Sequence, residues 1–138
     1  MQGSRRQARE RALSLLYEAS AKGQAPGSVL DALPVPPDEF TVDLVRGVES
    51  SIDEVDGLIA SHAIDWTLDR MPVVDLTLLR VATYELCHRP DIPTAAVISE
   101  AVELAGEYST DESGRFVNGV LAAIAGQVRP EESSPVDG

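Results

Sequence analysis

The chain has 138 residues, only 4% aromatic side chains and a formal net charge of −12. This length fits one domain, and a core poor in aromatic residues has to be built from aliphatic ones, which favours packed helices. The sequence has no apolar run long enough to cross a bilayer and no signal peptide. We therefore expect a soluble, cytoplasmic, all-α protein without membrane contact.

The first eleven residues differ in charge from the rest of the chain. They carry Arg5, Arg6, Arg9 and Arg11 against Glu10, which gives a local charge of +3 and leaves −15 for the remainder. Arginine grips phosphate at two points and stacks on bases. The cluster indicates either a phosphate-rich or acidic partner, or the solvated face of a helix.

The first predicted helix begins after Ser4, a good N-cap, and ends near Lys22, with Gly23 as its stop. Leu13 and Tyr17 continue a stripe that starts at Arg6 and Arg9, at helical spacing. These two side chains either contact a second layer of helices or form an exposed surface for a partner.

Residues 23–37 are rich in proline and glycine and are predicted to be a linker with one helical turn near 29–33. Two helices should follow from Asp38, with a seam at residues 50–53. The helix predicted over 72–88 is apolar on nearly every side, so we expect it at the centre of a bundle. Arg80 within it needs a carboxylate, for which the candidates are Glu85, Glu100 and Glu103.

The end of the chain contains two more predicted helices. One carries an apolar stripe over 97–105, and the other runs from Phe116 to Val128. Between them, residues 109–113 are predicted to be a capped turn. The acidic tail, 130–138, is expected to be disordered.

No motif for catalysis or cofactor binding is present in the sequence. It lacks a glycine-rich phosphate loop, and His62, Cys87 and His88 do not have metal-ligand spacing. A single cysteine excludes an internal disulfide, and Cys87 has the setting of a small core residue. We expect a protein that is not an enzyme and needs no cofactor or metal.

Four sequence blocks, in order, resemble the NusB family of transcription antitermination factors. They are SRRQARERALSLLYEA (Ser4 to Ala19), WTLDRMPVVDLTLLRVATYEL (Trp66 to Leu86), DIPTAAVISEAVELA (Asp91 to Ala105) and STDESGRFVNGVL (Ser109 to Leu121). The resemblance implies one RNA-binding domain over residues 1–129, with about seven helices in two small bundles packed crosswise.

The resemblance also implies a function and its partners. Members of this family pair with ribosomal protein S10 (NusE), and the pair binds the boxA element of ribosomal RNA transcripts. With RNA polymerase and the other Nus factors, the complex suppresses premature termination. We therefore expect S10 and single-stranded boxA RNA as direct partners of this chain.

The resemblance assigns roles to individual residues. It places Arg5, Arg6 and Arg9 in the arginine-rich RNA-binding motif, and it places further residues beside the RNA or facing S10. Those beside the RNA are Tyr108, Arg115 and Phe116, and those facing S10 are Tyr17 and Asp75. Phe116 is open to a second interpretation, as an ordinary core residue.

The charge of the chain bears on this expected function. With −12 overall, few phosphates can be neutralised, so we expect weak RNA binding by the protein alone and stronger binding with a basic partner such as S10. Two alternatives remain. One is the RNA-binding module that some RNA cytosine methyltransferases carry, although no methyltransferase domain follows here. The other is a homodimeric helical adaptor that associates through the stripe of Leu13 and Tyr17.

Overall fold

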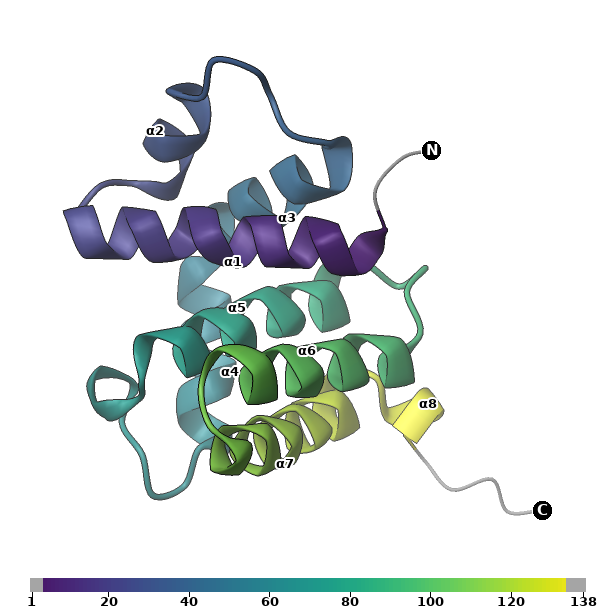
Figure 1. The fold of residues 1–138 in the computed structure, drawn as a ribbon. Helices are drawn as coiled ribbons and strands as arrows, with labels where there is room; N and C mark the ends of the chain where they lie inside the picture. The colour runs from purple at the N-terminus through teal and green to yellow at the C-terminus, as the bar shows by residue number, and fades with distance from the viewer. Residues whose placement is uncertain (1–3, 134–138) are drawn as a thin grey trace.

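The computed structural model describes residues 4–133, and over that range the chain is helical with short connections (Figure 1). The predicted all-α fold is confirmed. The elements are α1 (Arg5–Lys22), α2 (Pro26–Asp31), α3 (Glu39–Ser50), α4 (Ile52–His62), the 3₁₀ turn η1 (Leu68–Arg70), α5 (Val73–His88), α6 (Thr94–Tyr108), α7 (Asp111–Val128) and the short α8 (Pro130–Ser133). None of these helices is long and apolar enough to cross a membrane.

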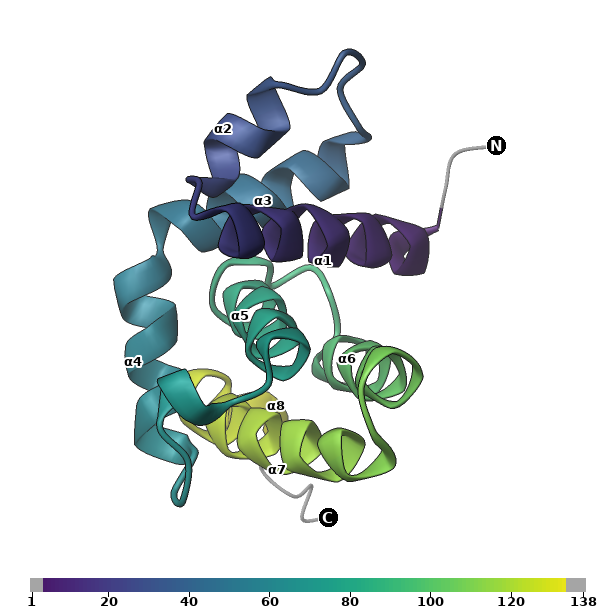
Figure 2. The same ribbon diagram turned by 60° about the vertical axis from the view of Figure 1, so that its left-hand side comes forward.

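The helices form two small bundles, as predicted. Helices α1, α2 and α3 make one layer, and α4 to α7 make the other, with α1 lying above α5 and α6 in Figure 2. Helix α5 contacts α1 and α3 from the first layer and α4, α6 and α7 from its own. Its nearly uniform apolarity is explained by this central position, because most of its residues are buried against other helices.

The ends of α1 follow the sequence signals closely. The Ser4 hydroxyl accepts a hydrogen bond from the Gln7 backbone, and the Gln7 side chain accepts one from the Ser4 backbone, which completes a capping box. Gly23 ends the helix in the left-handed region at φ 64°, a conformation that costs a side-chain-bearing residue more.

Three local predictions were wrong in part. The linker at 23–37 contains a whole helix, α2, which buries Val29 and Leu30. Of the turn predicted at 109–113, residues 111–113 belong to the first turn of α7. Thr110 is the N-cap of that helix, and its hydroxyl accepts a hydrogen bond from the Ser113 backbone. The tail predicted to be disordered begins with helical residues 130–133, and residues 134–138 lie outside the described range.

The partner of Arg80 also differs from the prediction. Its Nε and Nη2 donate to the two carboxylate oxygens of Asp56 in α4, at 2.8 and 2.9 Å. Glu85 and Glu103 are held instead by arginines of α1. The prediction missed Asp56 because the packing of α4 against α5 cannot be read from the sequence.

A buried ion pair joins the two layers. Arg9 of α1 donates from Nε and Nη2 to both carboxylate oxygens of Glu85 in α5, at 3.0 and 2.7 Å, and both residues are less than 5% exposed. Burial raises the pKa of Glu85, and the hydrogen bonds from Arg9 oppose that rise. A bidentate pair of this kind compensates much of the cost of burying two charges.

A second buried arginine closes the end of α5. Arg129, which follows α7, donates to the backbone carbonyls of Glu85, Leu86, Arg89 and Ile92. The last carbonyls of a helix lack partners within the helix. Arg129 donates to two of the last carbonyls of α5, those of Glu85 and Leu86, and to two carbonyls in the turn that follows, and thereby fixes the end of α7 to the end of α5.

The contact of α3 with α5 depends on a residue without a side chain. A Cβ at Gly47 would lie 2.2 Å from the ring of Tyr84, so only glycine leaves room for this ring. The Tyr84 hydroxyl donates to Asp43 one turn earlier in α3, at 2.7 Å. Helix α3 therefore offers Tyr84 both a gap and an acceptor.

Removing one member of the interlayer ion pair should destabilise the fold. We expect Arg9→Ala to lower the free energy of unfolding by about 3–5 kcal/mol, because Glu85 is then a buried charge without its main partner. Urea denaturation measures this change. Arg11→Ala, on the exposed side of the same helix, is the control and should change stability by less than about 0.5 kcal/mol. Equal effects of the two substitutions would contradict a structural role for the pair.

A methyl group at Gly47 should have the opposite effect from one at Gly57. Gly47→Ala forces Tyr84 to move and should cost about 1–3 kcal/mol. A Cβ at Gly57, inside α4, meets nothing within 4 Å, so Gly57→Ala should stabilise the protein by up to about 1 kcal/mol. Thermal unfolding of the two variants compares them directly. A neutral Gly47→Ala would show that the α3–α5 contact is loosely packed.

Candidate functional site

The arginines at the start of α1 face carboxylates of the neighbouring elements. Arg6 donates to Glu103 and to Glu107 of α6, the latter at 2.6 Å. Arg5 lies 3.8 Å from Asp91 in the turn before α6. Both side chains remain partly accessible, so a competing anion can reach them.

Arg9 differs from the other arginines of the cluster. Its side chain is only 5% exposed and is held by Glu85, with Glu100 a further 3.8 Å contact. The expectation that Arg9 contacts RNA therefore has to be corrected, because its guanidinium is inside the protein. Of the stripe that runs from Arg6 to Tyr17, Arg9 and Leu13 are buried against the second layer of helices, whereas Tyr17 is exposed.

Phe40 organises the same corner of the molecule. The guanidinium carbons of Arg5, Arg9 and Arg89 lie 5.2, 5.5 and 5.0 Å from the centre of its ring. Arg89 in turn donates to Asp43 and Asp91, and these hydrogen bonds raise the pKa of Arg89. Three cations gather on one aromatic ring because carboxylates surround them.

The junction of α6 and α7 carries two of the predicted RNA-contacting residues on the surface. Tyr108 is 48% exposed, and its hydroxyl donates to Glu10 of α1 at 3.1 Å. This hydrogen bond raises the pKa of Tyr108. Arg115 is exposed on α7. The hydrogen bond from Tyr108 shows that this junction adjoins the arginine-rich half of α1.

Phe116 lies partly in the core and partly in an aromatic pair. It packs against the buried cluster on one side, and its ring centre is 6.0 Å from that of Trp66, at a tilt of 59°. Trp66 is 46% exposed. Trp66 was not among the predicted site residues. The one sequence signal for it is its place at the start of the block Trp66 to Leu86, which carries the family resemblance.

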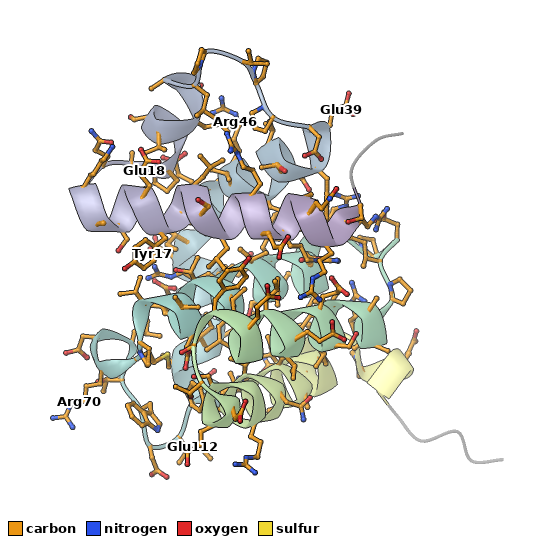
Figure 3. The ribbon with its side chains drawn as sticks, viewed as in Figure 1. Tyr17, Glu18, Glu39, Arg46, Arg70 and Glu112 are labelled. Carbon is orange, nitrogen blue, oxygen red and sulfur yellow. The ribbon has the colours of Figure 1, made fainter. Side chains whose placement is uncertain are left out.

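Three arginines keep their charge available to a ligand. Within residues 4–133, Arg11, Arg70 and Arg115 are exposed and make no ion pair with a described carboxylate. Arg70 projects from η1 at the end of the molecule that also carries Glu112 (Figure 3). These three side chains supply the uncompensated positive charge of an otherwise acidic surface.

The two residues expected to face S10 have different exposure. Tyr17 is 48% exposed on α1 (Figure 3), whereas Asp75 is buried in the first turn of α5. Leu13 is also buried, at 6% exposure. The homodimer alternative therefore loses Leu13 from its proposed contact surface, since that side chain packs within the protein.

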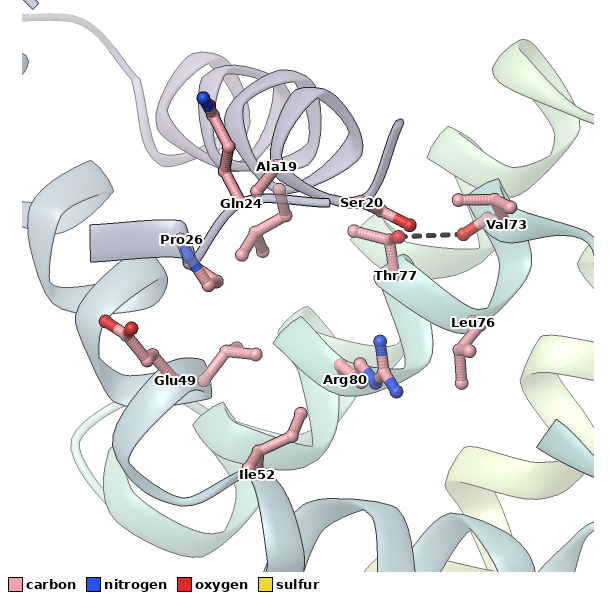
Figure 4. A pocket seen from close by; sticks show the side chains of 12 residues that line it. Ala19, Ser20, Gln24, Pro26, Glu49, Ile52, Val73, Leu76, Thr77 and Arg80 are labelled. Carbon is pink, nitrogen blue, oxygen red and sulfur yellow. Dashed lines mark hydrogen bonds between the residues drawn. The ribbon is translucent and has the colours of Figure 1, made fainter. Parts of the chain in front are cut away.

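A cavity of about 300 Å³ is lined by residues that lie close to Tyr17 in the sequence (Figure 4). The second half of α1 lines it with Leu16 and Ala19, and the first half of α5 lines it with Val73, Leu76 and Arg80. Most of its wall is apolar, and Arg80 is already neutralised by Asp56. The cavity thus lies between the second half of α1 and the first half of α5.

No three His, Cys, Asp or Glu side chains gather as metal ligands within residues 4–133. Burial raises the pKa of Cys87 to about 11, so its thiol is protonated at neutral pH and a poor nucleophile. Arginines, exposed aromatic rings and carboxylates are instead the means of binding RNA or another protein.

Comparison with known proteins gives consistent results over nearly the whole chain. The model of the NusB family matches residues 6–126. The chain is 50% identical over 129 residues to the transcription antitermination protein NusB of Salinispora tropica, covering 88% of this chain and 95% of that one. The NusB of Streptomyces griseus is 46% identical, covering 86% and 90%.

Solved structures agree with the sequence comparison. The NusB of T. maritima superposes with a TM-score of 0.85 at 33% identity, covering 96% of this chain and 98% of that one. A crystal structure of the antitermination factors NusB and NusE in complex with double-stranded RNA contains a chain with a TM-score of 0.76 at 29% identity, covering 89% and 96%. On this evidence of sequence and fold, the chain belongs to the NusB family.

Proposed function

We propose that this protein is a transcription antitermination factor that pairs with ribosomal protein S10 (NusE) and binds boxA RNA of ribosomal RNA transcripts. In the cytoplasm the pair would join RNA polymerase and the other Nus factors and suppress premature termination. Family membership supports this proposal, as does the related NusB that is solved together with NusE and RNA. The observation that carries it is the adjacency of the α6–α7 junction and the arginine-rich half of α1.

The RNA-facing surface, in this proposal, runs from the start of α1 across the α6–α7 junction. Arg5, Arg6 and Arg11 supply cations from α1, and Arg115 supplies one from α7. Tyr108 and the half-exposed Trp66, whose ring pairs with that of Phe116, offer flat surfaces on which the unstacked bases of single-stranded RNA can lie. Arg9 takes part only indirectly, since it fixes α1 to α5 beneath this surface.

Carboxylates reduce the affinity of this surface for RNA. Arg6 is held by Glu103 and Glu107, and Glu10 accepts the hydrogen bond of Tyr108. RNA phosphates have to displace these groups and also meet a net charge of −12. Both effects make S10, as a basic partner, the component that brings affinity to the complex.

RNA binding with and without S10 tests the proposed function. We expect boxA RNA to bind the protein alone weakly, and S10 to raise the affinity at least about tenfold at matched salt, because it adds phosphate contacts. Fluorescence anisotropy with boxA RNA and a scrambled strand, at two salt concentrations, measures both effects. Equal affinity with and without S10, or for the two strands, would contradict the proposal.

Neutralising the carboxylates around Arg6 should strengthen RNA binding. In the double variant Glu103→Gln with Glu107→Gln, Arg6 is released, so we expect several-fold tighter binding and a salt slope steeper by about one unit. The matched control is Glu39→Gln with Glu131→Gln, which makes the same change of net charge at exposed positions elsewhere. If both double variants bind RNA equally well, the gain reflects overall charge and Arg6 has no part in it.

A further inference from the structure

Glu10 of α1 is a carboxylate that no described cation holds. It lies one turn after Arg6, at a spacing that commonly gives an ion pair within a helix. Arg6 turns away from it and pairs with Glu103 and Glu107 of α6. The partner of Glu10 is the hydroxyl of Tyr108, which donates to its Oε2 at 3.1 Å. Because Glu10 is partly exposed and its Oε1 accepts no hydrogen bond from a described residue, this oxygen can accept one from a ligand.

Tyr108 holds this carboxylate at the rim of an exposed ring. The residue ends α6 and is 48% exposed, so a ligand can lie on its ring. The hydrogen bond to Glu10 raises the pKa of Tyr108, so the hydroxyl keeps its proton and remains a donor. A flat apolar surface and an oriented acceptor at its edge therefore form one unit, which we call the Tyr108–Glu10 platform.

The chemistry of this platform fits one of the four RNA bases. A base that stacks on Tyr108 brings the hydrogen-bonding groups of its edge towards the rim of the ring, where Glu10 lies. An ionised carboxylate has two acceptor oxygens and no donor. Guanine alone presents two adjacent N–H donors on its Watson–Crick edge, N1–H and the N2 amino group. The match gives two charge-assisted hydrogen bonds.

The same carboxylate disfavours the other three bases. Adenine and cytosine each place a ring nitrogen that is an acceptor beside their amino group, and uracil has a carbonyl on both sides of its single N–H. Each of them would direct an acceptor towards the ionised Glu10. Selection of this kind combines attraction to one ligand with repulsion of its competitors.

We propose that Glu10 is a specificity-determining residue, which selects guanine as the base that stacks on Tyr108. Arg6, which pairs with Glu107 next to Tyr108 in the chain, supplies the cation for the phosphate of the same stretch of RNA. This inference rests on the proposed function, since it names the base that the RNA surface reads. Glu10 costs affinity for any phosphate, and in return it contributes discrimination between bases.

The test begins with the unchanged protein, S10 and a set of boxA RNAs in which each position carries each of the four bases in turn. Fluorescence anisotropy at one salt concentration gives the affinities. We expect one position at which guanine binds about tenfold more tightly than adenine, the size of one good two-point base contact. Inosine, which lacks only the N2 amino group of guanine, should lose several-fold at that position.

Glu10→Gln should then change the two affinities in opposite directions. It weakens binding of the RNA with guanine, because one acceptor and the charge are lost. It strengthens binding of the RNA with adenine, because the new amide donates to N1 and its carbonyl accepts from the amino group. Glu39→Gln, an exposed position on α3 with the same change of charge, is the control and should raise both affinities by the same small factor.

A second variant covers the case in which Glu10→Gln does not fold. Tyr108→Phe keeps the ring and removes the hydroxyl that orients Glu10. The preference for guanine over adenine should narrow to about threefold, because the carboxylate is no longer held at the rim.

The outcomes separate the two proposals. If the unchanged protein with S10 does not bind boxA RNA, the proposed function fails and the inference fails with it. If the RNA binds and no position prefers guanine, only the role of Glu10 is overturned. The same holds if Glu10→Gln shifts the affinities for guanine and adenine equally, because that is an effect of overall charge.

Discussion

The buried pair of Arg9 and Glu85 is the interaction on which the arrangement of the molecule depends. It lies where the first layer of helices meets α5, the helix that contacts α1, α3, α4, α6 and α7. Its bidentate geometry sets the rotation of α1 about its own axis. The rotation that turns Arg9 inward leaves Arg5, Arg6 and Arg11 at or near the surface, so one internal contact determines which arginines a ligand can meet.

The same ion pair also explains why the candidate site for RNA is an open surface. The strongest polar contacts of α1 are used to join helices, and the remaining cations are distributed over α1, η1 and α7. Recognition of this kind comes from several modest contacts on a rigid framework, which suits a protein that assembles with partners. The exposed aromatic residues, Tyr17, Trp66 and Tyr108, come from three different connections or helices that the framework holds at fixed positions.

The sequence predicted much of the fold and only part of the site. The capping box at Ser4, the stop at Gly23 and the apolar α5 are local or periodic features, and each appears as expected. The roles of Arg9 and Arg80 were not predictable, because the carboxylates that hold them, Glu85 and Asp56, are distant in the chain or lie on an element whose packing was unknown. Periodicity gives the face of a helix, but it does not say what covers that face.

The carboxylates around Arg6 also have a consequence for the order of assembly. A protein of this net charge attracts a basic macromolecule from a distance and repels a polyanion, so its encounters with the two kinds of partner occur at different rates. A basic macromolecule therefore meets this protein faster than a polyanion does. Glu103 and Glu107 add to that difference close to Arg6, because an anion reaches its guanidinium only by displacing them.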